Sequence, residues 1–544
     1  MVMTFNGGDS WLRLTNARPV EYNEWCTLVA VHPRDSNWVY AGGVKLLYAS
    51  DGVNFIGTAG THDDHHVMAF DPNNDDVCYV ATDGGVFRST DRGVNWSLRS
   101  RYLTATQLLS LGVSDQGTFL AGSSTQDEGI IQTEGSYDWD NHGGGNEWGM
   151  FVVDPNDSKN VFISPFTPAY LKRSTDKGRT FTTLTNTLTE FWASENRETV
   201  AAEWRHIAIQ PGNSQVIVGV GGVRDQIKND EDVVTATYPK VERIYFSSNQ
   251  GDTWSRVHAF DQGGGTAVAF APSDTRRVYA VTNDGNCYRN DNMGQGNWYR
   301  PYIIVNNQPG SFTGIAVRPP PTGIITSVTV DNYDADIVYI TYSNVNPHVY
   351  RSTDGGFQWN AISGTNALNA LPDIAVTKLV IAPENKDILY VGTDVGVFRS
   401  NNAGNRWYAY NDSIGENDLP FCFVSGLAMH NATRRLFAAT RGRGLYFTST
   451  SGVNEFRVIE ISHRFNGHTF RGIQFLKVTD GNQTYIFSRR EVFQRIETGG
   501  SFYTVGPQGV RAEVISVQFN GLEYVQTAPD HTEANNLLSL PEFY

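Results

Sequence analysis

Residues 89–96 read Ser-Thr-Asp-Arg-Gly-Val-Asn-Trp, and variants of this octapeptide recur at 174–181, 247–254, 352–359 and 400–407. Each copy has a Ser, an Asp or Asn two residues later, a Gly after two more, and a final aromatic residue. The hydroxyl and the carboxylate or amide can bond backbone N–H groups of a tight turn, and Gly adopts conformations that other residues resist. The pattern therefore predicts a repeated turn. Its carboxylates are then structural, not catalytic: Asp91, Asp176 and Asp354.

Strand-like segments surround each of these turns. An apolar segment that ends at proline, such as 67–72, is followed by a polar turn, a second strand and a third strand that leads into the octapeptide. Four antiparallel strands repeated at roughly 40 to 60 residues are typical of a β-propeller blade. We count nine such units before residue 450.

The two ends of this repeat region predict how the ring closes. The last unit stops after its third strand, 443–447, without the turn motif, whereas residues 4–11 contain a copy of the motif followed by a strand. We therefore expect the N-terminal strand to complete the last blade, because closure removes the free edges of the sheets. The expected fold is all-β, with a single propeller of about nine four-stranded blades at 1–450.

Beyond residue 450 the turn motif is absent, and strands alternate apolar and polar residues at 457–461, 472–478 and 512–517. Such alternation is typical of half-buried strands. The sequence thus predicts a second, small and mainly β domain at 451–544.

Composition excludes several classes of function. The 544 residues carry 42 basic and 57 acidic side chains, a net charge of −15, without a basic block, so a nucleic-acid partner is not expected. The sequence contains no run of about 18 apolar residues, so insertion into a membrane is not expected. The N-terminus lacks the pattern of a signal peptide. We expect a soluble protein, cytoplasmic by default, or extracellular if a leader was removed or export is non-classical.

The repeated turns and Val-Tyr strands resemble the Asp-box propeller superfamily, which includes sialidase-like (BNR) and sortilin-like proteins. Residues 82–91 and 125–129 are similar to a bacterial, glycosyl-hydrolase-like branch of that superfamily. Two positions depart from its pattern, where Glu128 replaces Asn and Glu147-Trp148 replaces Asp-Gly. The resemblance implies the fold and leaves the activity open. The C-terminal part, through 524–530 and 535–541, resembles a small bacterial domain of unknown function.

In a propeller, the loops before the first strand and between the second and third strands reach one face, opposite the repeated turns. We expect ligand contacts on this loop face. The candidate ligand-binding residues are Glu24, Trp25, His65, Asp83, Gln126, Asp127, His142, Glu147, Trp148, Glu203, Trp204, Arg441 and Arg443. Six of the candidates form three Glu-Trp pairs, which suit a sugar because an indole stacks on C–H groups and a carboxylate accepts hydroxyl protons. The alternative is that each Trp packs between blades and each Glu is solvated.

Two kinds of chemistry remain open at this face. A glycosidase needs two carboxyl groups, and the candidates are Glu147, Glu203 and Asp127. The densest set of metal-ligand types is His62, Asp64 and His66, which could hold a divalent ion or be an ordinary polar loop. No other cofactor is expected.

Our leading hypothesis is a non-catalytic recognition or scaffold propeller that binds a glycan or protein ligand on its loop face. The C-terminal domain would then be an adaptor or a module for a larger assembly. One alternative is a glycoside hydrolase acting on a polysaccharide, and the other is a structural subunit.

Overall fold

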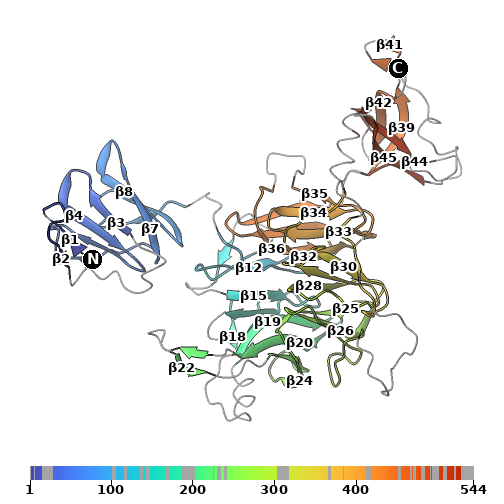
Figure 1. The fold of residues 1–544 in the computed structure, drawn as a ribbon, viewed down its shortest axis with the longest axis horizontal. Helices are drawn as coiled ribbons and strands as arrows, with labels where there is room; N and C mark the ends of the chain where they lie inside the picture. The colour runs from blue at the N-terminus through green and yellow to red at the C-terminus, as the bar shows by residue number, and fades with distance from the viewer. Residues whose placement is uncertain are drawn as a thin grey trace. The chain divides into compact units, whose positions relative to one another are not determined.

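A computed structural model gives the fold (Figure 1). It describes the chain except residues 1, 5, 15–27, 101–105, 116–118, 135–138, 143–147, 166–170, 185–201, 224–225, 229–233, 238–241, 303–317, 365–368, 384, 412–418, 451–454, 463, 466–467, 470–472, 480–483, 490–491, 493–500, 506–510, 520–521 and 528–544. The chain forms two compact units, 1–106 and 107–544. Strands make up almost all of the regular structure of both, which confirms the all-β prediction.

The first unit contains two four-stranded antiparallel sheets and a short hairpin. The hairpin pairs β1 (Val2–Met3) with β2 (Leu12–Arg13). The first sheet is β3 (Leu28–His32), β4 (Asp35–Gly42), β5 (Leu46–Ala49) and β6 (Ile56–Gly57). The second is β7 (His65–Asp71), β8 (Asn74–Thr82), β9 (Gly85–Ser89) and β10 (Ser97–Leu98).

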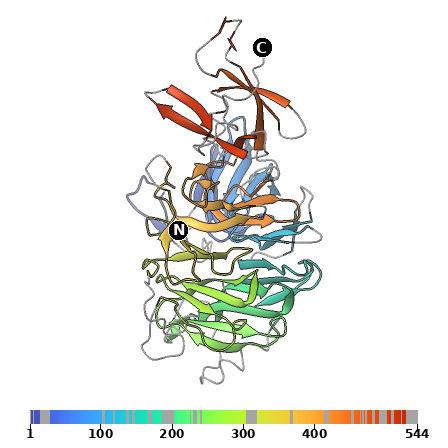
Figure 2. The ribbon, with the colours of Figure 1, turned by 90° about the vertical axis from the view of Figure 1, so that its right-hand side faces the viewer.

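Seven more sheets, built in the same up-and-down order, occupy residues 112–449 of the second unit (Figures 1 and 2). In chain order their strands are β11 (Gly112–Val113), β12 (Ala121–Ser124), β13 (Ile130–Thr133) and β14 (Asp140–Asn141); β15 (Trp148–Val153), β16 (Val161–Pro165), β17 (Lys172–Ser174) and β18 (Thr182–Thr183); β19 (Ala202–Gln210), β20 (Asn213–Val223), β23 (Glu242–Ser247) and β24 (Ser255–Ala259); β25 (Gly265–Ala271), β26 (Asp274–Thr282) and β27 (Cys287–Asn290); β28 (Ile325–Val330), β29 (Val338–Tyr342), β30 (Val349–Ser352) and β31 (Asn360–Ala361); β32 (Val376–Ala382), β33 (Asn385–Thr393), β34 (Gly396–Ser400) and β35 (Tyr408–Ala409); β36 (Val424–His430), β37 (Arg435–Thr440) and β38 (Leu445–Ser449). A separate hairpin, β21 (Gln226–Lys228) with β22 (Val234–Thr237), is inserted between β20 and β23.

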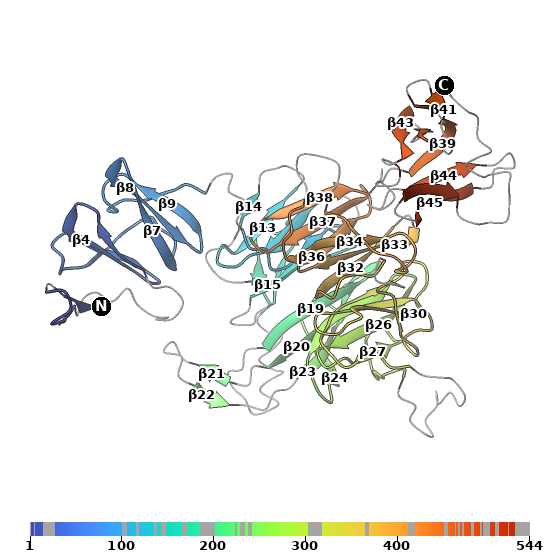
Figure 3. The same ribbon diagram turned by 45° about the horizontal axis from the view of Figure 1, so that its top comes forward.

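The first strands of these seven sheets contact one another in a closed series, and Figure 3 labels β15, β19, β32 and β36 of this series. Each of β11, β15, β19, β25, β28, β32 and β36 contacts the next, and β36 contacts β11. The contact between the last and first sheets closes the ring. The described strands of residues 112–449 therefore form a seven-bladed propeller.

Ring closure differs from the expectation that the N-terminal strand completes the last blade. The N-terminal strands pair with each other, and Met3 and Leu14 pack on the first sheet with Val39 and Ala41. In the second unit, the N–H of Leu108 donates to the oxygen of Thr440 at 3.0 Å, which joins the first blade of the ring to the last. The nine predicted sheets are present, but seven of them close the ring without the first two.

A β-bulge shapes the inner strand of most ring blades, because the register with the second strand shifts at one residue. The bulged residues are Gly149, Arg205, Thr266, Thr326, Thr377 and Ser425. Four of them use a hydroxyl to reach a backbone oxygen of the next blade. The bonds are Thr266 to Ile325 at 2.6 Å, Thr326 to Val376 at 2.6 Å, Thr377 to Val424 at 2.7 Å and Ser425 to Leu108 at 2.5 Å. The last of these bonds spans the closure.

The repeated octapeptide forms the turn that its residues predict. In the copy at 352–359, the Ser352 hydroxyl accepts the N–H of Gly356 at 2.9 Å and donates to Asp354 at 2.8 Å. Asp354 accepts the N–H of Gln358 at 2.9 Å, and Trp359 is buried. The same bonds surround Asp91 and Asp176. These carboxylates therefore hold turns together.

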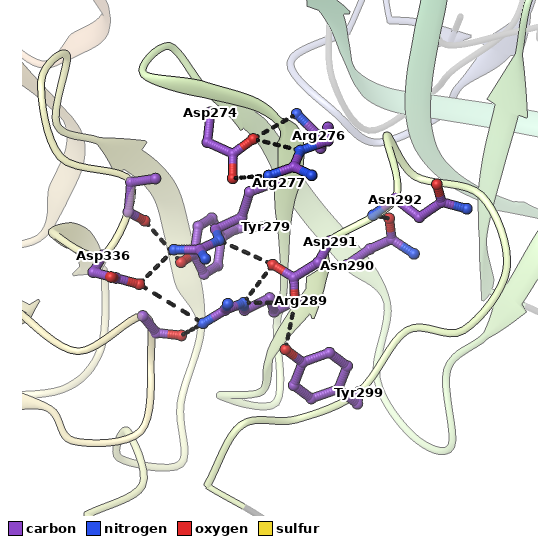
Figure 4. A network of polar contacts seen from close by, with 12 residues as sticks. Asp274, Arg276, Arg277, Tyr279, Arg289, Asn290, Asp291, Asn292, Tyr299 and Asp336 are labelled. Carbon is purple, nitrogen blue, oxygen red and sulfur yellow. Dashed lines mark hydrogen bonds and ion pairs between the residues drawn. The ribbon is translucent and has the colours of Figure 1, made fainter. Parts of the chain in front are cut away.

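Charged side chains add a second link between two neighbouring blades (Figure 4). Arg277 and Arg289 each donate to Asp291 at 2.9 Å. Arg277 also pairs with Asp336 of the next blade, and Arg289 donates to the oxygen of Gly355 in that blade at 3.2 Å. The two arginines are half-buried or buried between the blades, where such pairs are screened less than at the surface.

The C-terminal part has a core of its own. Its six-stranded sheet has the order β43-β42-β39-β44-β45-β46, and a small hairpin pairs β40 with β41. The bounds are β39 (Glu455–Ser462), β40 (Arg464–Phe465), β41 (His468–Thr469), β42 (Phe475–Thr479), β43 (Thr484–Ser488), β44 (Ser501–Val505), β45 (Arg511–Phe519) and β46 (Leu522–Thr527). Val458, Leu476, Val492 and Phe502 are among its fully buried residues. In the described part of the chain, no helix has the length and apolarity needed to cross a bilayer.

Candidate functional site

Several predicted ligand-binding residues meet where the last blade of the ring joins the first. Gln107 is the link, because its oxygen accepts the N–H of Gln126 at 3.1 Å and its backbone bridges to Arg441. Gln126 follows β12 and Arg441 follows β37, so both lie in loops between the second and third strands of their blades. We call the surface formed by Gln126, Asp127, Phe421, Phe423, Arg441 and Arg443 the seam surface.

Aromatic and basic groups dominate the last-blade side of the seam surface. Phe421 is 82% exposed, the largest exposure among the large apolar residues that the structure describes. The guanidinium of Arg441 lies 4.9 Å from the centre of the Phe423 ring, and the N–H of Arg441 donates to the Phe423 oxygen at 3.0 Å. Arg441 and Arg443 are both exposed. The surface thus combines an apolar ring with hydrogen-bond donors.

A tight turn presents Asp127 on the first-blade side. The residue has a positive φ of 65°, and the N–H and hydroxyl of Thr125 donate to the oxygen of Gly129 at 2.9 and 2.8 Å. The N–H of Glu128 donates to the oxygen of Gln126, and the amide of Asn141 donates to the oxygen of Glu128. This bonding fixes the backbone of the turn that carries the half-buried Asp127.

A carboxyl group with a raised pKa lies after β11, the inner strand of the first ring blade. Burial raises the pKa of Asp115, which follows β11, although the side-chain amide of Asn431 donates to it. Such a shift is what a general acid needs. However, the contact with Asn431 links the first blade to the last, which gives Asp115 a structural role in closing the ring.

Three candidate residues of the first unit, His65, His66 and Asp83, are engaged in local contacts. Both ring nitrogens of His65 have partners, the oxygen of Gly43 and the hydroxyl of Thr61, each at 3.0 Å. His65 is buried, and burial lowers its pKa. His66 pairs with Asp83 through Nε2 at 2.5 Å. These bonds account for the positions of three predicted side chains without a ligand.

The three metal candidates are not gathered into one site. His62 contacts the oxygen of Asp63 through Nδ1 at 3.2 Å, and His66 contacts Asp83. In the described residues, ligand atoms of His62, Asp64 and His66 do not all lie within 4.8 Å of one another.

Trp204 occupies the packing position that the sequence left as the alternative to ligand binding. It is 4% exposed and packs on Trp254 and Tyr245, with ring centres at 4.5 and 5.2 Å. Its indole belongs to the core between two blades and offers no face to a ligand. His142, which follows β14, is half-buried, and its N–H donates to the oxygen of Ile130.

The remaining candidates fall outside the described residues or side chains. These are Glu24, Trp25 and Glu147, together with the side chains of Trp148 and Glu203, whose backbones belong to β15 and β19.

The inner strands also bring together two residues that were not among the predicted site residues. His206 and Lys378 directly follow the bulges of β19 and β32 and line the central channel. Equivalent positions in other blades hold Met150, Ala267, Ser327 and Gly426. A basic residue at a position otherwise filled by uncharged residues is the signal that an alignment of the repeats would reveal.

Comparison with known proteins identifies one family model, for a protein of unknown function (DUF3892), which matches residues 458–541. A xyloglucanase of Hypocrea jecorina is 36% identical over 93 residues, 16% of this chain and 11% of that protein. Xyloglucanase Xgh74A of Acetivibrio thermocellus is 27% identical over 143 residues, 23% of this chain and 17% of that protein. The chain therefore matches less than a fifth of the length of either of these relatives.

Solved structures with similarity to the chain are propeller proteins. The GH74 enzyme of Niastella koreensis has a TM-score of 0.30 and 14% identity, over 84% of this chain and 81% of that one. YCF48 bound to D1 peptide has a TM-score of 0.36 and 12% identity, over 69% of this chain and 97% of that one.

Proposed function

We propose that the seven-bladed ring is a recognition domain that binds a polysaccharide on the seam surface without cleaving it. The observation that supports this proposal is the exposed Phe421, two residues before the Phe423 ring that Arg441 covers. An exposed aromatic ring can stack on the C–H faces of a sugar, while guanidinium and amide groups donate to its hydroxyls. Large apolar side chains that stay exposed beside polar groups commonly mark binding sites.

The choice of a polysaccharide draws on the curated relatives, which are named xyloglucanases. Xyloglucan is accordingly the first ligand to test. A protein ligand is the outcome that remains if polysaccharides do not bind.

The proposal can be tested by retention of the purified chain on a panel of insoluble or gel-embedded polysaccharides, with release of reducing ends measured in parallel. Phe421→Ala and Arg441→Ala should each weaken retention about tenfold, since aromatic and cation contacts are worth about 1–2 kcal/mol. Tyr333→Ala is a matched control, because Tyr333 is 71% exposed in a turn before β29 and away from the seam. Retention that survives both seam variants would refute the assignment of the site.

A glycoside hydrolase is the second candidate, favoured by the same xyloglucanase matches and by the fixed backbone of the turn that carries Asp127 on the seam surface. A glycosidase places its two carboxyl groups about 5–10 Å apart. Glu147 and Glu203 are the proposed partners of Asp127. Release of reducing ends that falls at least a hundredfold in Asp127→Asn, with retention unchanged, would establish hydrolysis and replace the recognition proposal.

For the C-terminal domain we propose a role in assembly. Its edge strand β43 exposes Ile486, which is 58% accessible, and an exposed apolar residue on an edge strand favours association. Light scattering of the full chain should show an oligomer that Ile486→Lys dissociates. A monomer at all concentrations would contradict this role.

A further inference from the structure

The central channel of the ring is a cavity of about 670 Å³ lined by the inner strands of all seven blades. It is distinct from the seam surface, because none of the six seam residues lines it. The lining exposes polar and apolar atoms in similar amounts, and its polar side chains include Thr329, Asn332 and Asn431. A cavity of this size is within the range that holds a small organic molecule.

The charge of the channel is opposite to that of the chain. Arg205, His206 and Lys378 line it, and its described lining contains no Asp or Glu. The chain as a whole has a net charge of −15. Anions in solution are repelled by the surface in general, so a basic interior is a local feature that needs its own explanation.

Arg205 is already neutralised. Its guanidinium donates to Glu242 at 2.8 Å, and it also reaches the oxygen of Gly265 in the next blade at 3.5 Å. Glu242 is buried and does not line the channel. This arginine therefore serves the contact between two blades.

Lys378 differs from Arg205. In the described part of the chain, its ammonium forms no hydrogen bond or ion pair with a protein group. Burial lowers its pKa, which is the expected effect on an ammonium group that lacks a counter-ion. Isolated charges inside proteins are costly and are normally paired. An anion from solution would supply the counter-charge that the described protein groups do not.

His206 offers a hydrogen-bond donor in the same channel. Its Nδ1 accepts the N–H of Val268 at 3.4 Å, so the neutral ring carries its proton on Nε2. Burial and then the positive charge of Lys378 lower the pKa of His206 to about 3, so the ring is neutral near pH 7. A neutral Nε2–H and an ammonium can both donate to one anionic oxygen group.

We propose that Lys378 and His206 form a binding site in the central channel for the oxyanion of a small molecule, a carboxylate or a phosphate. Lys378 supplies the charge and His206 the directed donor, while apolar residues of the lining such as Val328 and Leu379 contact the body of the molecule. Both residues directly follow a β-bulge of an inner strand, and both line the channel. This site is independent of the polysaccharide proposed for the seam surface.

The test is isothermal titration of the full-length chain with acetate, benzoate, citrate and inorganic phosphate, against sodium chloride at matched ionic strength. We expect saturable binding of at least one of these anions that chloride does not reproduce. The order of the four affinities identifies the class of ligand. A preference for phosphate indicates a phosphate ester, and a preference for benzoate or citrate indicates an organic acid. No saturable binding of any of the four would overturn the proposal.

Substitutions locate the site. Lys378→Met, which preserves length and removes the charge, should weaken binding at least tenfold, and His206→Gln should weaken it severalfold. Lys386→Met is the matched control, because Lys386 is an exposed lysine on β33 of the same blade. Equal binding by the Lys378 and Lys386 variants would refute the assignment. If Lys378→Met fails to fold, Lys378→Arg keeps the charge, and its retained binding together with loss in His206→Gln tests the same site.

The pH dependence gives an independent readout. The charged and titratable groups around the site are Lys378, His206 and Arg205 with Glu242. Binding should weaken as the pH rises through the lowered pKa of Lys378, because the ammonium then loses its proton. The Lys378→Arg variant should keep its binding over that range. A wild-type profile that stays flat up to pH 10 would contradict a role for the ammonium.

Discussion

The closed ring and the two-sheet first unit use the same blade but bury it to different extents. Val67 follows the bulge of β7 and is 57% exposed, whereas the equivalent Ala267 and Ser327 in the ring are 3% and 1% exposed. Val29 and Val31 of β3 are also exposed, at 59% and 49%. The sequence of a blade therefore makes it a sheet, and within the ring the adjacent blades bury its inner strand.

Leu108 offers the largest test of this difference, because it is fully buried where the ring closes. Leu108→Ala should lower the free energy of unfolding of the ring by about 2–5 kcal/mol, through lost apolar contact and a cavity. Leu98→Ala is the matched substitution in the first unit, where Leu98 is 54% exposed, and should cost less than about 0.5 kcal/mol. Thermal denaturation followed by tryptophan fluorescence measures both. Equal losses of unfolding free energy in the two variants would show that ring closure does not make the ring more sensitive than the first unit.

The repeated turn should matter equally in both regions, since its bonds are local. Ser352→Ala in the ring and Ser89→Ala in the first unit each leave a buried glycine N–H without its hydroxyl partner. Each should cost about 1–2 kcal/mol, as for a lost hydrogen bond to a buried group. Urea denaturation of the two variants gives the comparison. A loss confined to the ring would show that the turn depends on its neighbours.

The loss of turn stability at acid pH is the next smaller effect. The N–H of Thr180 and its hydroxyl hold the pKa of Asp176 at about 2, below its ordinary value. Stability from this group is therefore full above about pH 4 and is lost as the pH falls through about 2. Asp176→Asn should keep the turn, as Asn249 and Asn402 do in other copies, and remove this part of the acid dependence. The measurement is the unfolding midpoint between pH 5 and pH 2, and parallel curves for variant and wild type would contradict it.

The smallest expected effect is at Val67. Val67→Thr should change the free energy of unfolding by less than about 0.5 kcal/mol, because the side chain is exposed. Ala267→Thr at the equivalent ring position should destabilise by about 1–3 kcal/mol, since it adds volume and a hydroxyl to a packed interior. Calorimetry on both variants measures the contrast. A large loss at Val67 would show that this strand is covered in solution.

Much of this fold could be predicted because its signals are local. The octapeptide specifies the turn through side chains within eight residues, so the sequence alone was enough to place Asp91, Asp176 and Asp354 in turns. The number of blades in the ring could not be predicted in this way. Closure depends on whether Leu108 or residues 4–11 meet the last blade, and both segments carry suitable strand patterns.

The candidate site shows the same limit. Gln126, Asp127 and Arg441 could be assigned to the loop face from their places between strands, and the structure brings them together through Gln107. Trp204 could equally bind or pack, and only the contact with Trp254 decides between the two. Lys378 was not predicted, because its significance lies in facing the channel with His206, a residue that is distant from it in the sequence.

The hydroxyl bonds between blades have a fixed order along the chain, which bears on how the ring assembles during synthesis. Each bond runs from a blade to the one that follows it in the chain, from Thr266 to Ile325, Thr326 to Val376 and Thr377 to Val424. During synthesis, the blades of β28 and β32 therefore emerge after the donor that they accept from and before the segment that they donate to. The donor of the final blade, Ser425, returns to Leu108. The nascent chain must keep its first blade's edge available until the last one emerges.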